Sequence, residues 1–272
     1  MSTSSTAKLP DGNELYFTDS GPVPNSNDYT TLLIFHGSSF HGCFCTRSLL
    51  HSFAAAHNFR TINVNRKDYP GSTKYADAEL EDLKNGRLIF LERLGTLVAY
   101  LIDYFIQEGN VPKVNGDRSA GGIVPVGWSM GTATMMALFS NPTLIPKGVS
   151  RDLLEQYVRD IILYDPPHLS FGYNLPKGHN TYNPWADPDC KTMEEHYKAF
   201  NGWVSSYFDE PDGWAGNVNA LDMRKCAERS TMDSWTSEEM AAICDPQAAA
   251  RSELPMCVNF QMQLIFWRTD QT

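Results

Sequence analysis

The sequence predicts an α/β protein built on a mostly parallel, doubly wound sheet, and two observations lead to that prediction. Over residues 1–167, short apolar or β-branched runs alternate with segments of helical periodicity. Such alternation is typical of parallel strands joined by right-handed crossover helices. In addition, the segment Gly127 to Gly131 (Gly-Trp-Ser-Met-Gly) separates a strand pattern from a helix pattern. A glycine-bracketed serine in that position indicates a sharp turn that exposes the hydroxyl of Ser129.

The individual elements follow from their hydrophobic spacing. The continuous apolar run 31–35 predicts a strand that is buried on both faces, and the alternating pattern of 14–19 also predicts a strand. Apolar positions three and four residues apart predict amphipathic helices. The predicted strands are 14–19, 31–35, 61–65, 123–126 and 161–164, and the predicted helices are 46–57, 76–108 and 132–139.

Composition narrows the class of function. The chain has 272 residues, of which 42% are hydrophobic, enough for one large core. Its formal net charge is −10 and no run of Lys or Arg occurs, which disfavours nucleic acid and anionic membrane partners. No apolar stretch is long enough to span a membrane, and the first residues lack the apolar region of a signal peptide. We expect a cytoplasmic protein with a small-molecule substrate and no obligate protein partner.

The six cysteines are scattered, without the paired spacing of a zinc site or the density of a disulfide framework. Free thiols are therefore expected, with a redox pair of Cys43 and Cys45 as the alternative. No glycine-rich phosphate loop or clustered ligand set appears, so we expect neither a cofactor nor a metal ion.

After residue 167 the chain becomes rich in aromatic residues, proline, glycine and acid, with helical fragments near 191–208 and 236–244. This texture is typical of an inserted helical lid. We therefore divide the chain into a core (1–167), a helical cap (168–250) and a last segment (251–272) that is a remnant of the core or the cap.

Ser129 is the predicted nucleophile. A serine at such an elbow takes a strained backbone conformation, and Gly127 and Gly131 remove the side chains that would collide there. The helix that starts behind the serine favours developing negative charge. The loop His36-Gly37-Ser38-Ser39 follows the strand 31–35, so its backbone N–H at Ser38 can form an oxyanion hole together with the N–H of Met130.

The sequence resembles the α/β-hydrolase family, and most closely its cap-bearing fungal members. The resemblance runs through Asp19 to Pro22, Leu33 to Gly37, Asn65 to Ser72, Gly127 to Gly131 and Leu163 to Pro167. It implies acyl transfer to water, in which Ser129 attacks an ester-like carbonyl beneath the cap. The cap aromatics either form the wall of an apolar substrate pocket or pack as plain cap core; they are Tyr182, Trp185, Trp203, Tyr207, Phe208 and Trp214.

The family pattern breaks at the acid and the base. The family places both on loops after the final strands, yet none of the seven histidines lies in the last 76 residues. We expect the chain to lack the segment that carries them. Alternatively, Asp165 supplies the acid while His168 or His179 reaches back as the base. The remaining readings are a binding protein that keeps the fold without turnover, and a lyase or cyclase on the same fold.

Overall fold

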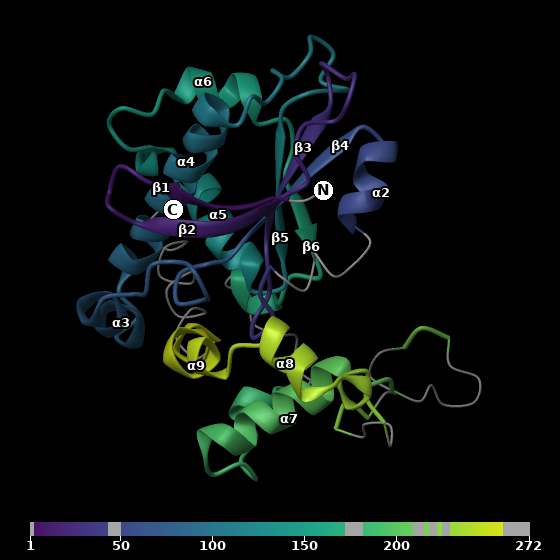
Figure 1. The fold of residues 1–272 in the computed structure, drawn as a ribbon. Coiled ribbons are helices and arrows are strands. Elements are labelled where there is room, and N and C mark those ends of the chain that lie inside the picture. The colour runs from purple at the N-terminus through teal and green to yellow at the C-terminus, as the bar shows by residue number, and fades with distance from the viewer. Residues whose placement is uncertain are drawn as a thin grey trace.

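The computed structural model describes residues 3–42, 50–171, 182–208, 215–217, 222–224 and 229–257. Its centre is a six-stranded sheet in the order β1-β2-β4-β3-β5-β6 (Figure 1). Strand β2 runs antiparallel to both of its neighbours, and β4, β3, β5 and β6 are mutually parallel. The strands are β1 (Thr3–Lys8), β2 (Glu14–Asp19), β3 (Thr30–Phe35), β4 (Phe59–Val64), β5 (Ile123–Trp128) and β6 (Ile162–Tyr164). The predicted mostly parallel α/β sheet is confirmed.

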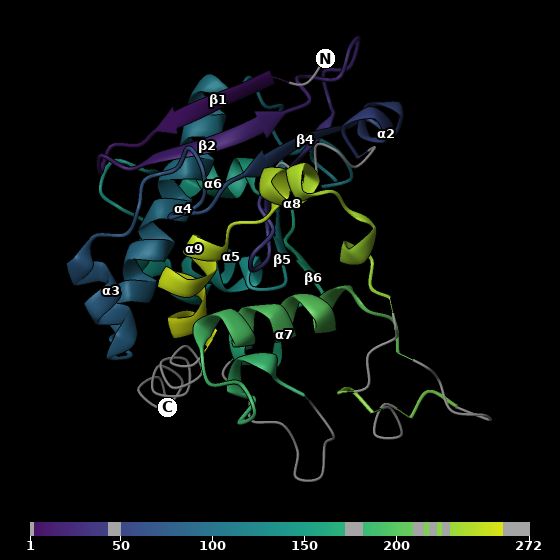
Figure 2. The same cartoon turned by 60° about the horizontal axis from the view of Figure 1, so that its bottom comes forward.

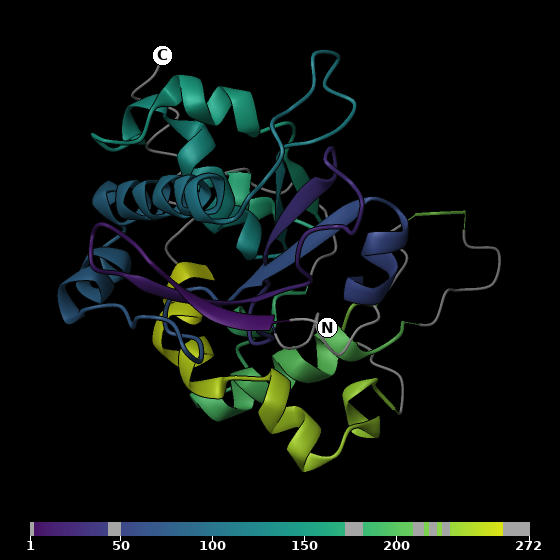
Figure 3. The same cartoon turned by 45° about the horizontal axis from the view of Figure 1, so that its top comes forward.

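Helices cover both faces of the sheet. Helix α2 (Leu50–Ala56) lies on one face, and α4 (Leu88–Glu108), α5 (Gly131–Ser140) and α6 (Arg151–Tyr157) lie on the other (Figure 3). The apolar stripe of α4 packs against α5 and the sheet, and it supplies much of the main core cluster. A stripe of this width buries a helix face because apolar side chains recur every three to four residues.

The predicted single helix over 76–108 is wrong at its centre. The structure has two helices, α3 (Asp77–Lys84) and α4, separated by a turn at Gly86. Gly86 has φ +63°, a left-handed conformation that ends a helix and that glycine adopts without strain. The apolar spacing continues across the turn, so periodicity alone does not reveal it.

Strand β1 was not predicted. Its six residues are mostly polar, and only Ala7 is buried. The strand is nevertheless held along its whole length by antiparallel pairing with β2, from Thr3 opposite Asp19 to Lys8 opposite Glu14. Pairing of an edge strand uses backbone groups, which leave no apolar signature in the sequence.

The carboxyl ends of β3, β5 and β6 meet at one edge of the sheet, where the helices of the predicted cap also gather (Figures 1 and 2). These are α7 (Met193–Ser205), α8 (Ser237–Ile243) and α9 (Pro246–Ala248), followed by a π-helical turn, η6 (Ala249–Glu253). Short 3-10 turns complete the described elements: η1 (Pro142–Leu144), η2 (His168–Phe171), η3 (Pro184–Ala186) and η5 (Met232–Ser234).

The loop after β3 joins the core to these helices. Phe40 belongs to the same apolar cluster as Trp185, Phe200 and Ile243, and it forms an antiparallel bridge with Cys244. The N–H of Asp245 donates to the carbonyl of Ser39 at 2.9 Å, and the N–H of His41 donates to that of Ile243 at 3.0 Å. The loop and the end of α8 are thus bonded through their backbones.

Two further observations concern membranes and thiols. None of the described helices has the length and apolar character that a membrane span needs. Cys190, Cys244 and Cys257 are free thiols, and the proposed redox pair of Cys43 and Cys45 lies outside the described residues.

Candidate active site

Ser129 stands at the turn between β5 and α5 in a left-handed conformation, with φ +50°. A Cβ at Gly127 would lie 2.5 Å from the Cα of Thr132, and a Cβ at Gly131 would lie 2.1 Å from the carbonyl oxygen of Phe35. Both contacts are with backbone that cannot move aside, so both positions require glycine. The bracketing glycines thus permit a strained turn that presents the Ser129 side chain at the carboxyl end of the sheet.

The loop after β3 passes directly over this serine. A Cβ at Gly37 would lie 3.0 Å from the Cβ of Ser129 and 3.5 Å from its hydroxyl oxygen. Ser38 and Met130 are buried, at 4% and 3% exposure. Within the described parts of the chain, neither of their backbone N–H groups has an acceptor. Buried N–H groups are rarely left without one, so both groups are available to donate hydrogen bonds to a ligand oxygen.

Hydrogen bonds to the carbonyl of Gly37 fix the orientation of the peptide between Gly37 and Ser38. The carbonyl of Gly37 accepts hydrogen bonds from His36 Nδ1 at 2.8 Å and from the guanidinium of Arg66 at 3.0 Å. His36 Nε2 accepts from the backbone N–H of Arg66 at 3.1 Å, which places the ring proton on Nδ1. Burial, helped by the nearby charge of Arg66, holds the pKa of His36 well below its usual value. His36 is therefore a neutral structural residue.

Ser129 opens into a cavity of about 300 Å³ between the sheet edge and the cap helices. The structure brings together here Ser129, Ser38, Met130 and Asp165, all four of which were singled out from the sequence. The lining combines a polar floor from the core with apolar walls from the cap; the described residues around it are Ser38, Ser129, Met130, Asp165, Pro166, Pro167, His168, Tyr182, Asn183, Pro184, Trp185, Phe200, Trp203, Val204, Met223 and Cys257.

Fewer contacts hold Asp165 and His168, the predicted acid and one of the candidate bases. Asp165 follows β6 with φ +48°, and His168 lies three residues further on. Among the described residues, no hydrogen bond or ion pair joins Asp165 to His168, or either of them to the hydroxyl of Ser129. Partial desolvation lowers the pKa of His168, so its imidazole is neutral near pH 7. The other candidate base, His179, lies outside the described residues.

The cap aromatics divide into two groups. Tyr182, Trp185 and Trp203 line the cavity, where the rings of Trp185 and Phe200 stack at 4.7 Å. Tyr207 is 72% exposed and takes no part in the lining. Phe208 also lies outside the lining, and Trp214 lies outside the described residues.

Cys257 also lines the cavity, and the sequence patterns did not identify it. Burial raises the pKa of its thiol, which keeps the sulfur protonated at neutral pH. A protonated thiol is a poor nucleophile, so Cys257 does not compete with Ser129 for that role.

The order of the strands, the reversed direction of β2 and the strained serine between β5 and α5 together decide the fold. The fold is that of the α/β hydrolases. The turn at Ser129 lies where this fold places its nucleophile elbow, at the carboxyl end of a central parallel strand.

No family model matches the sequence, and no curated protein matches it. Many solved structures resemble its fold, and the three described below share no more than 18% of their residues with it. An esterase from Exiguobacterium antarcticum is 18% identical, with a TM-score of 0.38, over 62% of this chain and 48% of that one. This chain therefore matches about half of the esterase's length.

Two other matches extend over nearly the whole chain. A laboratory-evolved variant of potato epoxide hydrolase is 12% identical, with a TM-score of 0.48, over 99% of this chain and 76% of that one. A putative aryl esterase from Burkholderia cenocepacia is 13% identical, with a TM-score of 0.44, over 96% and 71%. These likenesses assign neither an activity nor a substrate to this chain.

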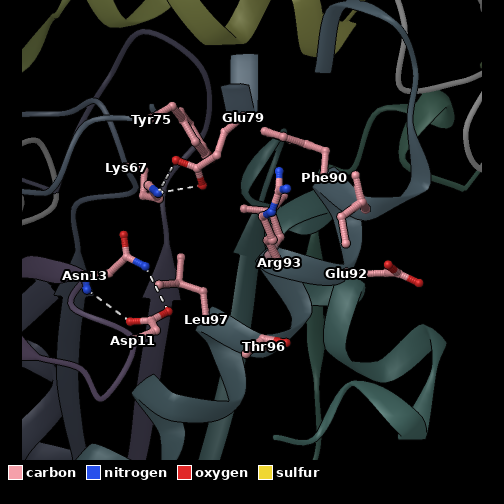
Figure 4. Close-up of a pocket in the computed structure, with 12 residues that line it drawn as sticks. Asp11, Asn13, Lys67, Tyr75, Glu79, Phe90, Glu92, Arg93, Thr96 and Leu97 are labelled. Carbon is pink, nitrogen blue, oxygen red and sulfur yellow. Dashed lines mark hydrogen bonds and ion pairs between the residues drawn. The ribbon is translucent and has the colours of Figure 1, made fainter. Parts of the chain in front are cut away.

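A second cavity, of about 340 Å³, lies between α4, the β1–β2 turn and the segment after β4 (Figure 4). Lys67 reaches into it and is bound to both carboxylate oxygens of Glu79, at 2.8 and 2.9 Å. Asp11 accepts hydrogen bonds from Asn13, and Arg93 is paired with Asp82. Four of its five charged side chains, those of Asp11, Lys67, Glu79 and Arg93, already have partners, and Ser129 is not among its lining residues.

Proposed function

We propose that the protein is a serine hydrolase of the α/β-hydrolase type that cleaves apolar, ester-like small molecules. One observation carries the proposal: the strained Ser129 lines a cavity together with Ser38 and Met130, whose buried backbone N–H groups have no acceptor among the described residues. That combination supplies a nucleophile and a site for the negative charge that develops on a carbonyl oxygen.

The chemistry follows from these groups. The oxygen of Ser129 attacks the carbonyl carbon and the carbonyl π electrons move to the oxygen, where the N–H groups of Ser38 and Met130 stabilise the charge. The proton of Ser129 passes to a base and then to the departing alcohol. Water repeats the sequence on the acyl-enzyme and releases the acid.

Among the described residues that line this cavity, His168 is the one histidine, and we assign the role of base to it, with Asp165 as the acid that orients it. Its lowered pKa leaves the imidazole free to accept a proton at neutral pH. The hydrogen bond to Ser129 has to form when substrate binds, because catalytic hydrogen bonds are often long in the free enzyme.

The walls of the cavity suggest the class of substrate. Trp185, Phe200 and Trp203 are large apolar surfaces, and the polar residues Ser38, Ser129 and Asp165 line the same cavity. Such a division favours a substrate with one ester-like group and an apolar or aromatic body.

A second candidate function is binding without turnover. It is favoured by the hydroxyl of Ser129, which makes no hydrogen bond to any side chain that the structure describes. A serine that cannot lose its proton binds ligands but does not attack them.

A fluorophosphonate probe separates the two functions. We expect the wild-type protein to be labelled at Ser129, as mapped by mass spectrometry of the labelled peptide, and Ser129→Ala to remove the label. Ser140→Ala serves as the control, because its hydroxyl only donates to a helix carbonyl. An unlabelled wild-type protein that still binds apolar esters would replace the hydrolase proposal with the binding function.

A further inference from the structure

A buried carboxylate reaches the oxyanion loop from the far end of the chain. Glu253, in η6, is 1% exposed and lies 215 residues from Ser38 in the sequence. The hydroxyl of Ser38 donates to its Oε2 at 2.6 Å, and the guanidinium of Arg66 pairs with its Oε1 at 2.5 Å. Both partners are themselves buried. A buried carboxylate is stable only when it is paired and hydrogen-bonded in this way.

These contacts form a closed ring around one peptide unit. The guanidinium of Arg66 that binds Glu253 also donates to the carbonyl of Gly37 at 3.0 Å, and Glu253 accepts from the side chain of Ser38. The ring therefore holds the peptide between Gly37 and Ser38 by its carbonyl and by the side chain that follows it.

Because the peptide bond is planar, these contacts also fix the direction of the N–H of Ser38. In a planar trans peptide, the C=O and the N–H point to opposite sides. Because the carbonyl of Gly37 is turned toward Arg66 and His36, the N–H of Ser38 is turned away from them. Ser38 and Ser129 line the same cavity, and a Cβ added at Gly37 would lie 3.0 Å from the Cβ of Ser129.

We propose that Glu253 is a positioning residue that, through Arg66 and the Ser38 hydroxyl, aims the N–H of Ser38 at the oxyanion. The role rests on the proposed hydrolase function. Glu253 touches neither the substrate nor the nucleophile, and it acts by keeping one hydrogen-bond donor in line before the reaction begins. Preorganised donors of this kind are a large part of the rate enhancement in acyl transfer.

The test uses Glu253→Gln, which keeps an oxygen for Ser38 but removes the charge that holds Arg66. We expect the rate of fluorophosphonate labelling at Ser129 to fall about tenfold to a hundredfold, less than or similar to the loss of a whole oxyanion donor. With a chromogenic apolar ester, kcat should fall by a similar factor while KM changes by less than about threefold, because the oxyanion forms only in the transition state.

A matched control separates positioning from general destabilisation. Asp19→Asn breaks another buried ion pair, that of Asp19 with Arg60, at the opposite end of β4. It should lower the melting temperature while leaving the labelling rate of the folded protein unchanged. Ser38→Ala keeps the backbone N–H and the ion pair but removes one contact of the ring, and it should slow labelling several-fold with a smaller loss of stability.

Hydrogen exchange gives a readout that does not depend on activity. Amide exchange in peptides that cover residues 36–40 should accelerate in Glu253→Gln but not in Asp19→Asn. Wild-type rates of labelling and exchange in both Glu253→Gln and Ser38→Ala would overturn the positioning role while leaving the hydrolase proposal intact. A wild-type protein that is not labelled at Ser129 would instead overturn the hydrolase proposal and the role with it.

Discussion

The two sides of the cavity around Ser129 differ in the contacts that hold their residues in place. On the side of the oxyanion loop, Gly37, Ser38, Arg66 and Glu253 are locked by short hydrogen bonds and a buried ion pair. On the side of β6, Asp165 and His168 share the cavity without any bond between them among the described contacts. In the proposed mechanism, the donors that stabilise negative charge are in place before substrate arrives, whereas the groups that transfer the proton come together afterwards.

In the proposed mechanism, this difference indicates which step limits the rate of the reaction. Electrostatic stabilisation needs fixed donors, because reorientation during the reaction costs part of the gain. A general base needs only to come within hydrogen-bond reach, so it tolerates a mobile starting position at the expense of a lower rate. We therefore expect substitutions on the rigid side to act through structure and those on the open side to act through proton transfer.

The largest expected effect comes from Gly131→Ala on the rigid side. The added Cβ would lie 2.1 Å from the carbonyl oxygen of Phe35 and 2.5 Å from that of His36, so strands or loop must separate. We expect the free energy of unfolding to drop by at least about 3 kcal/mol in urea titrations, together with loss of labelling at Ser129. Gly116→Ala is the control, because nothing lies within 4 Å of its added Cβ. Wild-type stability in Gly131→Ala would show that the elbow is not tightly packed against β3.

The next effect concerns the open side. His168→Gln should slow the labelling of Ser129 about 10²-fold, the usual contribution of a general base. The pKa of His168 is lowered from the ordinary value of 6.5, so the base is fully active above pH 6.5. The wild-type rate should be flat near pH 7 and fall as the pH drops through the lowered pKa, whereas the variant should lack that inflection. Equal rates and equal profiles in both proteins would assign the proton to another acceptor.

The smallest effect tests the wall that both sides share. Trp203→Ala should raise KM about tenfold for an ester with an aromatic body, because removing apolar contact in a pocket costs a few kcal/mol at most. The value of kcat should change little. Tyr207→Ala is the matched control, since Tyr207 is 72% exposed and lies outside the cavity. A similar KM in Trp203→Ala and the wild type would mean that substrate does not contact this wall.

The rigid side also shows which features of the structure can be predicted from the sequence. Strands β3, β4 and β5 and the turn at Ser129 were predictable because buried parallel strands are apolar or β-branched runs and because the elbow needs glycine on both sides. The position of Ser38 followed from its place directly after a buried strand. These features are local, so a short window of sequence contains them.

Glu253 and Arg66 carry no comparable signal. A carboxylate in a helical turn looks the same whether it faces water or a buried guanidinium, and the partners of Glu253 are far away in the sequence. Likewise, β1 is held by backbone pairing, and Gly86 interrupts a stripe whose spacing continues beyond it. Long-range pairing and turns that preserve periodicity are the features that hydrophobic pattern does not reveal.

The contacts of the loop after β3 limit how the lid of this protein can be exchanged. Lids on this kind of fold invite exchange between proteins, as a means of changing what the pocket accepts. Here the loop beside Ser129 is bonded to the backbone of Asp245 and packs through Phe40 against the region that an exchange would replace, and Glu253 follows that region directly in the chain. A transplanted lid would therefore bring its own selectivity but leave the recipient's donor peptide without support. In the proposed hydrolase, an exchange of the lid would therefore change both the substrate selectivity and the orientation of the Ser38 N–H.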